Sequence, residues 1–514
     1  MVSAVLFITF FVLLVLNVPI SICLGLSSAA AILYSGTSLT IVATNIYSGI
    51  SKFLLLAIPF FVLSGNIMAK AGISTRLIRF VDTCVGHRKG GIANVCIIVA
   101  CFFGAISGSG PATVAALGAV LIPAMVERGG FSAPFSTALM ATASSIAIVI
   151  PPSIAFVVYA SITGVSIGDM FMAGIVPGIL MGLALIVVVM LEVHKNHVVP
   201  SNVQKASAKE RLDAFKDAFW GFLMPVIILG GIYGGIFTPT EAAAVSVVYG
   251  LFVGMVIYKE VKLKDLWDIL IDSAKTTGGI MLIVACASLF SFVCTRFGIS
   301  AAASQLLAKV AGNQFTFLLI AGCFIDANSA MYIFIPIMLP VCKQLGYNVI
   351  AFGIMATVNL AIGQVTPPVG VNLFVAIGVK LKNGLQVTLQ QISRAVVPMV
   401  AACIVVLLMI TYIPGISTFL PAALGSAAAV ENGTTTGGDS GTTATDNDDF
   451  NTIEDYSDLD WPEMTWNFTC STTETSTWAQ AGRKFGELME QATGGKIKVE
   501  VYAADQLTGG NQSE

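Results

Sequence analysis

The sequence predicts an all-α polytopic membrane protein, built as an inverted repeat of two halves and followed by a short α/β tail. Three observations support this fold class. Hydrophobic residues make up 56% of the 514 residues and charged residues only 11%, with a mean hydropathy of +0.87. Two long apolar segments each carry a polar break at the centre. The motifs around these two breaks also recur in the same order in both halves of the chain.

The composition excludes several classes of protein. The apolar share exceeds what the core of a soluble protein needs, so much of the apolar surface must face lipid. The formal net charge is −3, and Lys and Arg gather in a few loops without the basic surface typical of nucleic-acid binding. The 10 cysteines form no CxxC pair and the 3 histidines lie in basic loops. We therefore expect no enzyme, no nucleic-acid partner, and no metal centre or cofactor built on these residues.

Several segments are apolar and long enough to cross a bilayer as helices, at about 20 residues per crossing. The first of them lacks the basic start of a signal peptide, so we interpret it as a helix that is retained. The predicted helices lie near residues 4–17, 18–35, 50–69, 133–162, 168–193, 219–237, 239–258, 275–297, 349–379 and 395–413.

Two further segments, 91–126 and 311–345, are too long for one crossing and too short for two. Each has its polar break at the centre, "SGSG" in the first and "DANSA" in the second. Irregular backbone inside a membrane persists only where it is buried in protein or lines a cavity. We therefore predict two re-entrant helical hairpins, which enter the membrane part of the way and turn back.

The hairpins belong to an internal repeat. "SGSGPATVAALGAVLIPAM" followed by "SSIAIVIPPSIAFVVYA" parallels "DANSAMYIFIPIMLPVC" followed by "LAIGQVTPPVGVNLFVA". Each half thus contains a hairpin and a helix broken by a Pro-Pro pair. With an odd number of full crossings in the first half, 1–217, the second half, 218–425, must enter from the opposite side. Inverted repeats with broken helices are the architecture of secondary transporters.

The basic loops predict the orientation in the bilayer. Lys and Arg cluster in 70–89, 195–216 and 380–394, and the positive-inside rule places these loops in the cytoplasm. Between Arg394 and Arg483 there is no Lys or Arg, which favours a C-terminus on the opposite side.

The chain changes character after the last predicted crossing. Residues 426–462 are rich in Gly, Ser, Thr and Asp without a basic residue, and we interpret them as a flexible acidic linker. In 463–514, "MTWNFTC" and "KIKVEVY" predict strands on either side of an amphipathic helix. One such βαβ unit is too small for a stable core, so we interpret it as the truncated start of a domain.

The first hairpin tip carries hard oxygen ligands. Gly108 and Gly110 allow the chain to turn, and Ser107 and Ser109 offer hydroxyl oxygens beside freed carbonyl groups. Opposite them, Pro151 and Pro152 lack N–H donors and free carbonyls one turn earlier, near Val149. Neutral oxygens of this kind suit a monovalent cation such as Na⁺, and helix N-termini at the tip favour an anion.

The second half repeats this pattern with Asn328 and Ser329 at the tip and with Val365, Thr366 and Pro367 opposite. The alternative for any single Ser, Gly or Pro is close helix packing or a kink. Two matched motifs in one inverted repeat favour a cation and substrate site.

Two acidic residues lie in or near the predicted spans. Asp326 stands near the centre of the second hairpin, and Glu241 follows Thr238 by three residues. Acids inside a membrane are functional candidates. Equally, Glu241 can complete a capping box with Thr238, and Asp326 can cap the second arm of its hairpin.

In these motifs the chain resembles the large membrane subunit of tripartite ATP-independent periplasmic (TRAP) transporters. The resemblance rests on "LLLAIPFFVLSGNIMAKAGIS", "GAISGSGPATVAALGAVLIPAM", "IPPSIAFVVYASITGVSIGDMFMAGIVPG", "GGIFTPTEAAAVSVVYG", "IDANSAMYIFIPIMLP" and "GQVTPPVGVNLFVAIGV", in order over about residues 1–420. It implies an elevator-type importer of organic acids, such as C4-dicarboxylates or sialic acid, in the bacterial inner membrane, driven by Na⁺. It also implies two partners, a small four-helix membrane subunit and a periplasmic solute-binding protein.

The resemblance also implies roles for individual residues. One Na⁺ site would use Ser107 and Ser109 with carbonyls near Val149 and Pro151. The second would use the tip at Asn328 with Val365 and Pro367. Substrate would lie between the tips, near Thr113, Thr366 and Asn372. One departure is Asn66, where members of the family often carry Glu.

The C-terminal segment resembles the start of a TRAP solute-binding protein, through "TWNFTCSTTETSTWAQAGRKFGELMEQATGGKIKVEVYAADQLTGG". The chain would then be a membrane subunit fused to a shortened binding protein on the periplasmic side. The arginine that clamps a carboxylate in such proteins has no equivalent here.

Two other readings remain open. One is a stand-alone symporter for Na⁺ and dicarboxylates, which needs no binding protein. The other is a membrane receptor or scaffold that docks a periplasmic protein without transport.

Overall fold

The computed structural model describes residues 2–16, 18–195, 205–299, 327–344, 347–367, 370–379, 387–424, 464–470, 477–493 and 495–503. The chain forms two compact units, Met1–Thr434 and Thr435–Glu514. The predicted linker 426–462 lies outside the described residues, as do Asp326 and the first arm of the predicted second hairpin.

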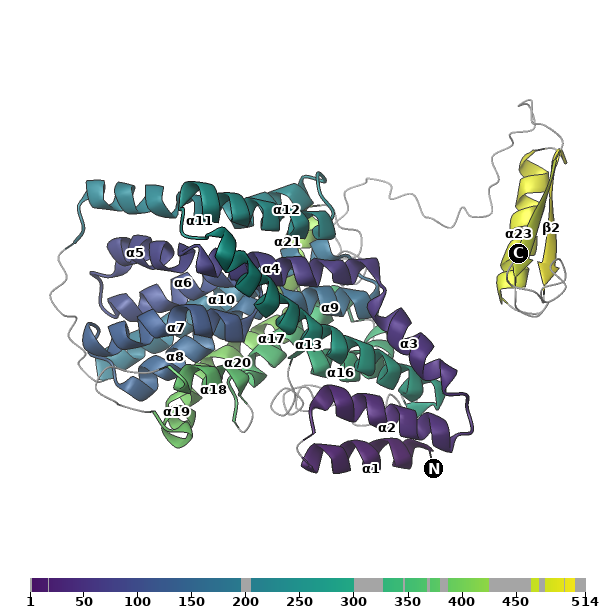
Figure 1. Cartoon of the computed structure of the whole chain (residues 1–514), viewed down its shortest axis with the longest axis horizontal. Coiled ribbons are helices and arrows are strands. Elements are labelled where there is room, and N and C mark those ends of the chain that lie inside the picture. The colour runs from purple at the N-terminus through teal and green to yellow at the C-terminus, as the bar shows by residue number, and fades with distance from the viewer. Residues whose placement is uncertain are drawn as a thin grey trace, which may run out of the picture. The chain divides into compact units, whose positions relative to one another are not determined.

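The larger unit is entirely helical over its described residues (Figure 1). Its first part contains α1 (Val2–Val15), α2 (Ile20–Tyr34), α3 (Thr40–Ile50), η1 (Phe53–Leu56), α4 (Ala57–Lys70), α5 (Ile73–Val85), α6 (Gly91–Ser107), α7 (Gly110–Glu127), α8 (Ala133–Ser145), η2 (Ile146–Ile148), α9 (Ile154–Thr163) and α10 (Ile167–Lys195).

The second part continues with α11 (Ala208–Tyr233), α12 (Pro239–Phe252), η3 (Val253–Ile257), α13 (Leu263–Arg296), α16 (Ala327–Gln344), α17 (Val349–Gly363), α18 (Val371–Ile377), α19 (Leu389–Ala395), α20 (Val397–Tyr412) and α21 (Gly415–Ala423). Within the described ranges, six helices are long and apolar enough to cross a membrane, or seven if the bent pair of α19 and α20 counts as one span. The prediction of a helical polytopic membrane protein is confirmed.

Two segments that we predicted as basic loops are helical instead. The segment 70–89 contains α5, which buries Ile73, Leu77 and Val81 on one face and leaves its charges on the other. Apolar side chains spaced four residues apart lie on one face of a helix and allow it to pack, even where mean hydropathy is low.

The second such segment is 195–216, whose later residues form the start of α11. Ser207 accepts from the backbone N–H of Glu210, whose carboxylate accepts from the backbone N–H of Ser207. This capping box begins the helix about three turns before the apolar stretch that we predicted, 219–237.

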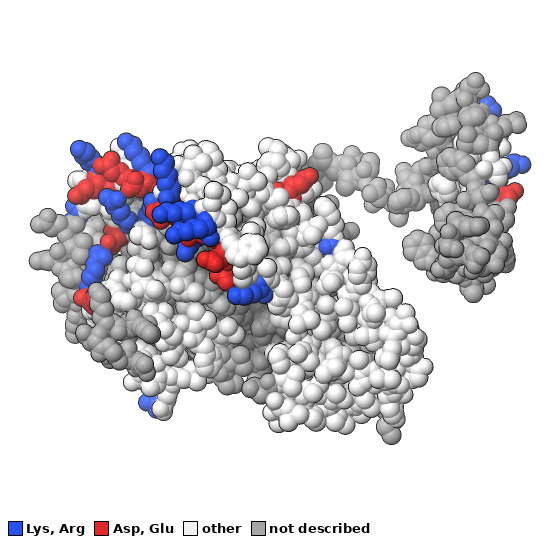
Figure 2. Space-filling view, viewed as in Figure 1, with Lys and Arg blue, Asp and Glu red and all other residues white. Residues whose placement is uncertain are grey.

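Charged side chains gather at one end of the larger unit. Figure 2 shows Lys, Arg, Asp and Glu over the region of α5, the start of α11 and the first turns of α13, whereas the rest of this face is almost uncharged. Three ion pairs hold this end together: Arg76 with Glu260 at 2.6 Å, Arg79 with Asp217 at 2.9 Å, and Arg128 with Asp82 at 3.0 Å. An uncharged face is the one that lipid covers.

The smaller unit has the strand, helix and strand that the sequence predicted. Strands β1 (Met464–Cys470) and β2 (Ile497–Ala503) pair in parallel, with Met464 opposite Ile497. The connecting helix α23 (Thr477–Ala492) packs closely against β2. The contact is at Gly486, where a Cβ would lie 3.1 Å from the Cβ of Val499. A parallel pair requires such a crossover connection.

Candidate functional site

The chain breaks and turns at the predicted first tip. Helix α6 ends at Ser107, and Gly108 follows in the left-handed region at φ 60°, its N–H bonded to the carbonyl of Gly104 at 2.9 Å. Ser109 is the N-cap of α7, yet its side chain makes no capping hydrogen bond. Helix α7 therefore begins with uncapped backbone N–H groups.

Three predicted site residues at this tip form one hydrogen-bonded cluster. The Ser107 and Thr113 hydroxyl oxygens are 2.8 Å apart, and Thr113 Oγ1 donates to the carbonyl of Ser109 at 2.8 Å. Thr113 is fully buried and Ser107 nearly so. The structure thus brings together the hydroxyl groups that we assigned to a cation and to substrate.

The Pro-Pro pair breaks the first long helix, as predicted. Helix α8 and η2 end at Ile148, a cis peptide joins Pro151 and Pro152, and α9 begins at Ile154. Ser153 links the two sides of the break. Its hydroxyl donates to the carbonyl of Ile148 and accepts from the backbone N–H of Phe156. We did not anticipate this role for Ser153, although a Ser directly before a helix is a known N-cap signal.

The hairpin tip lies on this break. A Cβ at Gly108 would be 2.7 Å from the carbonyl oxygen of Pro152, and one at Gly104 would be 2.8 Å from the Cα of Ala147. The carbonyl oxygen of Val149 lies directly against Gly174 of α10. The structure therefore brings the Pro152 carbonyl to the tip, while the Val149 carbonyl contacts α10.

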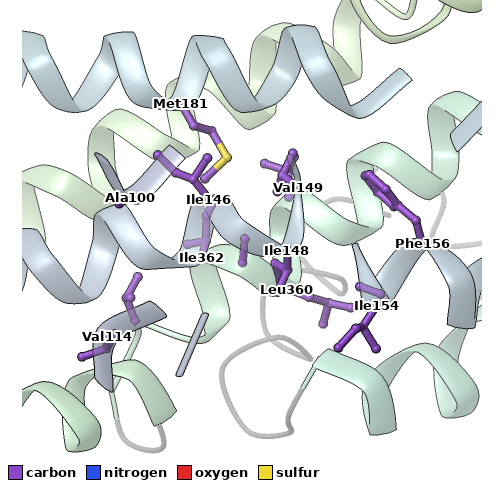
Figure 3. Close-up of a cluster of buried hydrophobic side chains, with 14 of the residues drawn as sticks. Ala100, Val114, Ile146, Ile148, Val149, Ile154, Phe156, Met181, Leu360 and Ile362 are labelled. Atoms are coloured by element: carbon purple, nitrogen blue, oxygen red, sulfur yellow. The ribbon is translucent and has the colours of Figure 1, made fainter. Parts of the chain in front are cut away.

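A cluster of apolar side chains packs around the first break. Figure 3 shows side chains from α6, α7, η2, α9, α10 and α17 gathered there, among them Ala100, Val114, Ile148, Phe156, Met181 and Leu360. All of these are buried. The polar groups at the break are thus held in an apolar environment, where each hydrogen bond is stronger than it is in water.

The second broken helix is α17 followed by α18. Between them Val365 is fully buried, and Thr366 Oγ1 bonds back to the carbonyl of Ile362 at 2.7 Å. Asn372, in the first turn of α18, donates its backbone N–H to the carbonyl of Gln364 at 3.1 Å. Pro367 lies in the same connection.

The second break meets the first hairpin. A Cβ at Gly110, the first residue of α7, would be 2.5 Å from Gln364 Oε1 and 2.8 Å from Asn372 Nδ2. Asn372 also donates from Nδ2 to the carbonyl of Ala141 in α8 at 3.2 Å. Sequence reasoning missed Gln364, because its place beside Gly110 depends on packing between distant segments.

The predicted second tip is described only in part. Asn328 and Ser329 lie in the first turn of α16, which begins at Ala327. The start of α16 thus coincides with the predicted start of the second arm of this hairpin.

A cavity of about 340 Å³ opens beside the first tip. Its polar lining is Asn66, Ser107, Ser109 and Thr276, and the remaining lining is apolar or glycine. Asn66 donates from Nδ2 to the hydroxyl of Ser273 at 2.8 Å. The cavity therefore presents amide and hydroxyl groups without a formal charge.

Glu241 caps a helix. Thr238 accepts from the backbone N–H of Glu241, and the Glu241 carboxylate accepts from the backbone N–H of Thr238 at 2.8 Å. The capping box is confirmed, and it engages this carboxylate at the start of α12. Across the described ranges, His, Cys, Asp and Glu form no cluster of three that suits a metal ion.

These features define a class of protein, a polytopic helical membrane protein with broken helices around a polar centre. Its fold is similar to that of the YdaH transporter of Alcanivorax borkumensis, with a TM-score of 0.52 over 73% of this chain and 88% of the other. Sequence identity to that structure is 14%, so the likeness concerns the fold.

The sequence comparison is more specific. Residues 7–416 match the family described as "Tripartite ATP-independent periplasmic transporter, DctM component". The chain belongs to this family of TRAP transporter large permeases.

Several curated relatives are similar over most of the chain. The C4-dicarboxylate large permease DctM of Pseudomonas aeruginosa is 41% identical over 78% of this chain and 94% of the relative. The isethionate permease DctMQ of Oleidesulfovibrio alaskensis is 41% identical over 81% of this chain and 66% of that longer relative. The 2,3-diketo-L-gulonate large permease YiaN of Escherichia coli is 36% identical over 76% and 94%.

Proposed function

We propose that the protein imports small organic acids across the bacterial inner membrane, coupled to Na⁺ and moving by an elevator mechanism. Substrate would come from a periplasmic solute-binding protein, and a small four-helix subunit would share the membrane. Membership of the TRAP large permease family supports transport as the activity.

One observation carries the proposal most directly: a hairpin tip and two helix breaks converge on a buried polar centre. Gly108 contacts the first break at Pro152, and Gly110 contacts the second at Gln364 and Asn372. Unpaired backbone inside a membrane is expensive unless it lines a site. A merely structural scaffold has no need of this arrangement at its centre.

The ligand types support Na⁺ as the coupling ion. Ser107 and Ser109 offer hydroxyl oxygens, and carbonyl oxygens are freed at the Pro151–Pro152 break. We assign a second Na⁺ to the region of Asn328, Ser329, Val365 and Pro367. Uncharged oxygen ligands are sufficient for a monovalent cation.

The relatives' names support small acids as the substrate class. They are named for C4-dicarboxylates, isethionate and 2,3-diketo-L-gulonate. We place the substrate beside Thr113, Thr366 and Asn372. The uncharged polar lining of the adjoining cavity provides hydrogen bonds for such a molecule.

We also propose that the C-terminal unit is the start of a binding-protein domain on the periplasmic side. The parallel β1–α23–β2 unit is a crossover unit of the kind from which α/β domains are built. Limited proteolysis of spheroplasts tests this location, since only a periplasmic tail is accessible to added protease.

The test of transport is uptake of labelled succinate, L-malate and sialic acid into proteoliposomes. These would contain this chain, the small subunit and a full-length binding protein, with and without an inward Na⁺ gradient. We expect gradient-dependent uptake that Ser109→Ala weakens at limiting Na⁺. Ser48→Ala, on the exposed face of α3, is the matched control.

The outcomes separate the alternatives. Uptake that persists without the binding protein would favour a stand-alone symporter. Uptake of no acid under either condition, with binding-protein docking retained, would favour a receptor or scaffold. Uptake independent of Na⁺ would contradict the coupling.

A further inference from the structure

A further cavity, of about 380 Å³, lies between α6, α10 and α11. Its lining comes from the second half of α6, the middle of α10, the later turns of α11, and Ile150 and Pro151 of the first helix break. Among the described residues that line it, the thiol of Cys101 is the sole side-chain group that is not hydrocarbon. We call this space the apolar cavity.

The apolar cavity lies at the depth of the hydrocarbon layer. The charged residues nearest to it along the three helices are Asp169 and Glu192, each six residues from a lining residue of α10. Six residues of helix extend about 9 Å. Three lining residues, Phe102, Ile179 and Leu183, are 40%, 52% and 53% exposed. Since the uncharged exposed surface of this unit faces lipid, these residues form a mouth that opens to the lipid tails.

Helix contacts bound the apolar cavity at both ends. On the charged side of the unit, the rings of Phe102 in α6 and Phe222 in α11 meet edge to face, with centroids 4.9 Å apart. On the other side, a Cβ at Gly168 in α10 would lie 3.6 Å from Cγ2 of Ile232 in α11. From Phe222 to Ile232, α11 extends about 15 Å. A transmembrane helix needs a groove along the whole hydrocarbon thickness of about 30 Å, so it does not fit between these contacts.

The lining also excludes polar occupants. An ordered water molecule needs several polar partners, and a carboxylate without hydrogen bonds in an apolar site is costly. If the cavity were empty, the side chains around it would lack the van der Waals contacts that a packed interior provides. A narrow hydrocarbon chain is the occupant that supplies these contacts.

We propose that the apolar cavity binds one acyl chain of a membrane phospholipid, which enters from the lipid between α10 and α11. This ligand is neither the transported acid nor the coupling ion. The inference therefore goes beyond the proposed function, and it depends only on the position of these helices in the membrane.

The bound acyl chain packs against the first helix break from behind. The side chain of Ile150 lies directly against Gly178 of α10, and Pro151 is buried beside it. Gly108 of the hairpin tip contacts the same break at Pro152. With the acyl chain in place, the break has packed neighbours on both sides, so the lipid should stabilise the folded protein.

Photocrosslinking tests whether an acyl chain enters. The full chain is reconstituted in nanodiscs of phosphatidylethanolamine and phosphatidylglycerol, with some phosphatidylethanolamine that carries a diazirine in one acyl chain. After illumination, mass spectrometry of peptides locates the adducts. Lipid around the protein labels exposed residues such as Val248. Adducts at the buried lining residues Ile97, Ala105 and Pro151 report an acyl chain inside the cavity.

We expect adducts at these three buried residues in the wild-type protein. In the double variant Ile179→Trp and Leu183→Trp, the larger side chains obstruct the mouth, so these adducts should fall about fivefold or more. The matched double variant Val248→Trp and Phe252→Trp has the same spacing on the exposed face of α12 and should leave them unchanged.

Thermal unfolding gives a second measurement. Phospholipid added to the detergent-purified chain should raise the thermal midpoint of the wild type and of the α12 variant. It should raise that of the mouth variant much less, because the acyl chain no longer enters.

Three results would overturn the inference. Adducts confined to exposed residues show that no acyl chain enters the cavity. Equal adducts at the buried lining residues in all three proteins refute entry through this mouth. Loss of these adducts when the small membrane subunit is added shows that a protein helix covers the mouth in place of lipid. None of these results bears on the importer proposal, which uptake tests separately.

Discussion

Both helix breaks lie at a Pro-Pro pair, but they differ in how their polar groups are hydrogen-bonded. At the first break the Ser153 hydroxyl bonds both the Ile148 carbonyl and the Phe156 N–H, so these two groups are paired within the break. At the second break the side-chain oxygens of Gln364 and Asn372 have no hydrogen-bond partner among the described residues and lie close to Gly110. Both breaks are buried in the same helical unit.

The difference teaches that a broken helix is not by itself a binding site. Hydrogen bonds between groups of the same break make it rigid. The first break, with the bonds of Ser153, can thus hold the hairpin tip in position. A break with unpaired groups has capacity left for a ligand. We therefore assign Ser153 of the first break to positioning, and the carbonyl groups freed beside it to the proposed Na⁺ site.

The largest effect should come from Gly108→Ala, which disturbs the contact between the tip and the first break. The left-handed backbone and the clash with the Pro152 carbonyl together cost about 2–5 kcal/mol. Uptake should be lost and the thermal midpoint lowered. Gly164→Ala is the control, since Gly164 has φ +80° but nothing within 4 Å of a Cβ. An equal loss in both variants would mean that the contact has no importance.

Ser153→Ala should be next, because it leaves the buried Ile148 carbonyl without a donor and uncaps α9. We expect about 1–3 kcal/mol lower stability toward unfolding, measured in detergent. The ratio of affinities for L-malate and succinate should stay the same. If the affinity ratio changed while the stability toward unfolding did not, Ser153 would act in substrate recognition and not in positioning.

Gln364→Leu should behave in the opposite way. Because Gln364 Oε1 has no hydrogen-bond partner in the part of the chain that the structure describes, replacing the side chain with an apolar one of similar size should not lower stability in the absence of substrate. A thermal midpoint lowered by as much as in Ser153→Ala would show that Gln364 is structural.

The smallest effect should come from Thr366→Val. Its hydroxyl bonds back to the carbonyl of Ile362 within α17 and its side chain is half-buried, so about 0.5–1 kcal/mol is expected. Substrate affinity measured in the same preparation shows whether this hydroxyl also contacts the acid, as the sequence predicted. An affinity loss of tenfold with little change in stability would support that contact.

The breaks could be predicted from sequence because their signals are local. Pro151, Pro152 and Gly108 restrict or free the backbone wherever they occur, so the break and the turn were placed correctly. The start of α11 was missed because Lys209 and Arg211 lower the mean hydropathy of its first turns. The helix nevertheless begins before the apolar stretch.

The partners at the site could not be predicted, since they depend on contacts between distant segments. Nothing near Gly110 in the sequence indicates Gln364, and Asn372 was named without its bond to Ala141. Local rules give the position of a break. Which oxygen is left without a donor is decided only when the helices pack.

The length of α13 determines where the cavity lies with respect to the lipid. Its 34 residues extend about 51 Å, whereas the hydrocarbon layer is about 30 Å thick. Five of its charged residues precede Thr276 and Arg296 ends the helix, whereas from Thr276 to Thr295 there is none, a stretch of about 20 residues that matches one hydrocarbon thickness. Thr276 lines the cavity, as does Asn66 one turn before Lys70. The route from the cavity to water on the charged side is therefore one or two helical turns, and the route to the other side crosses most of the bilayer.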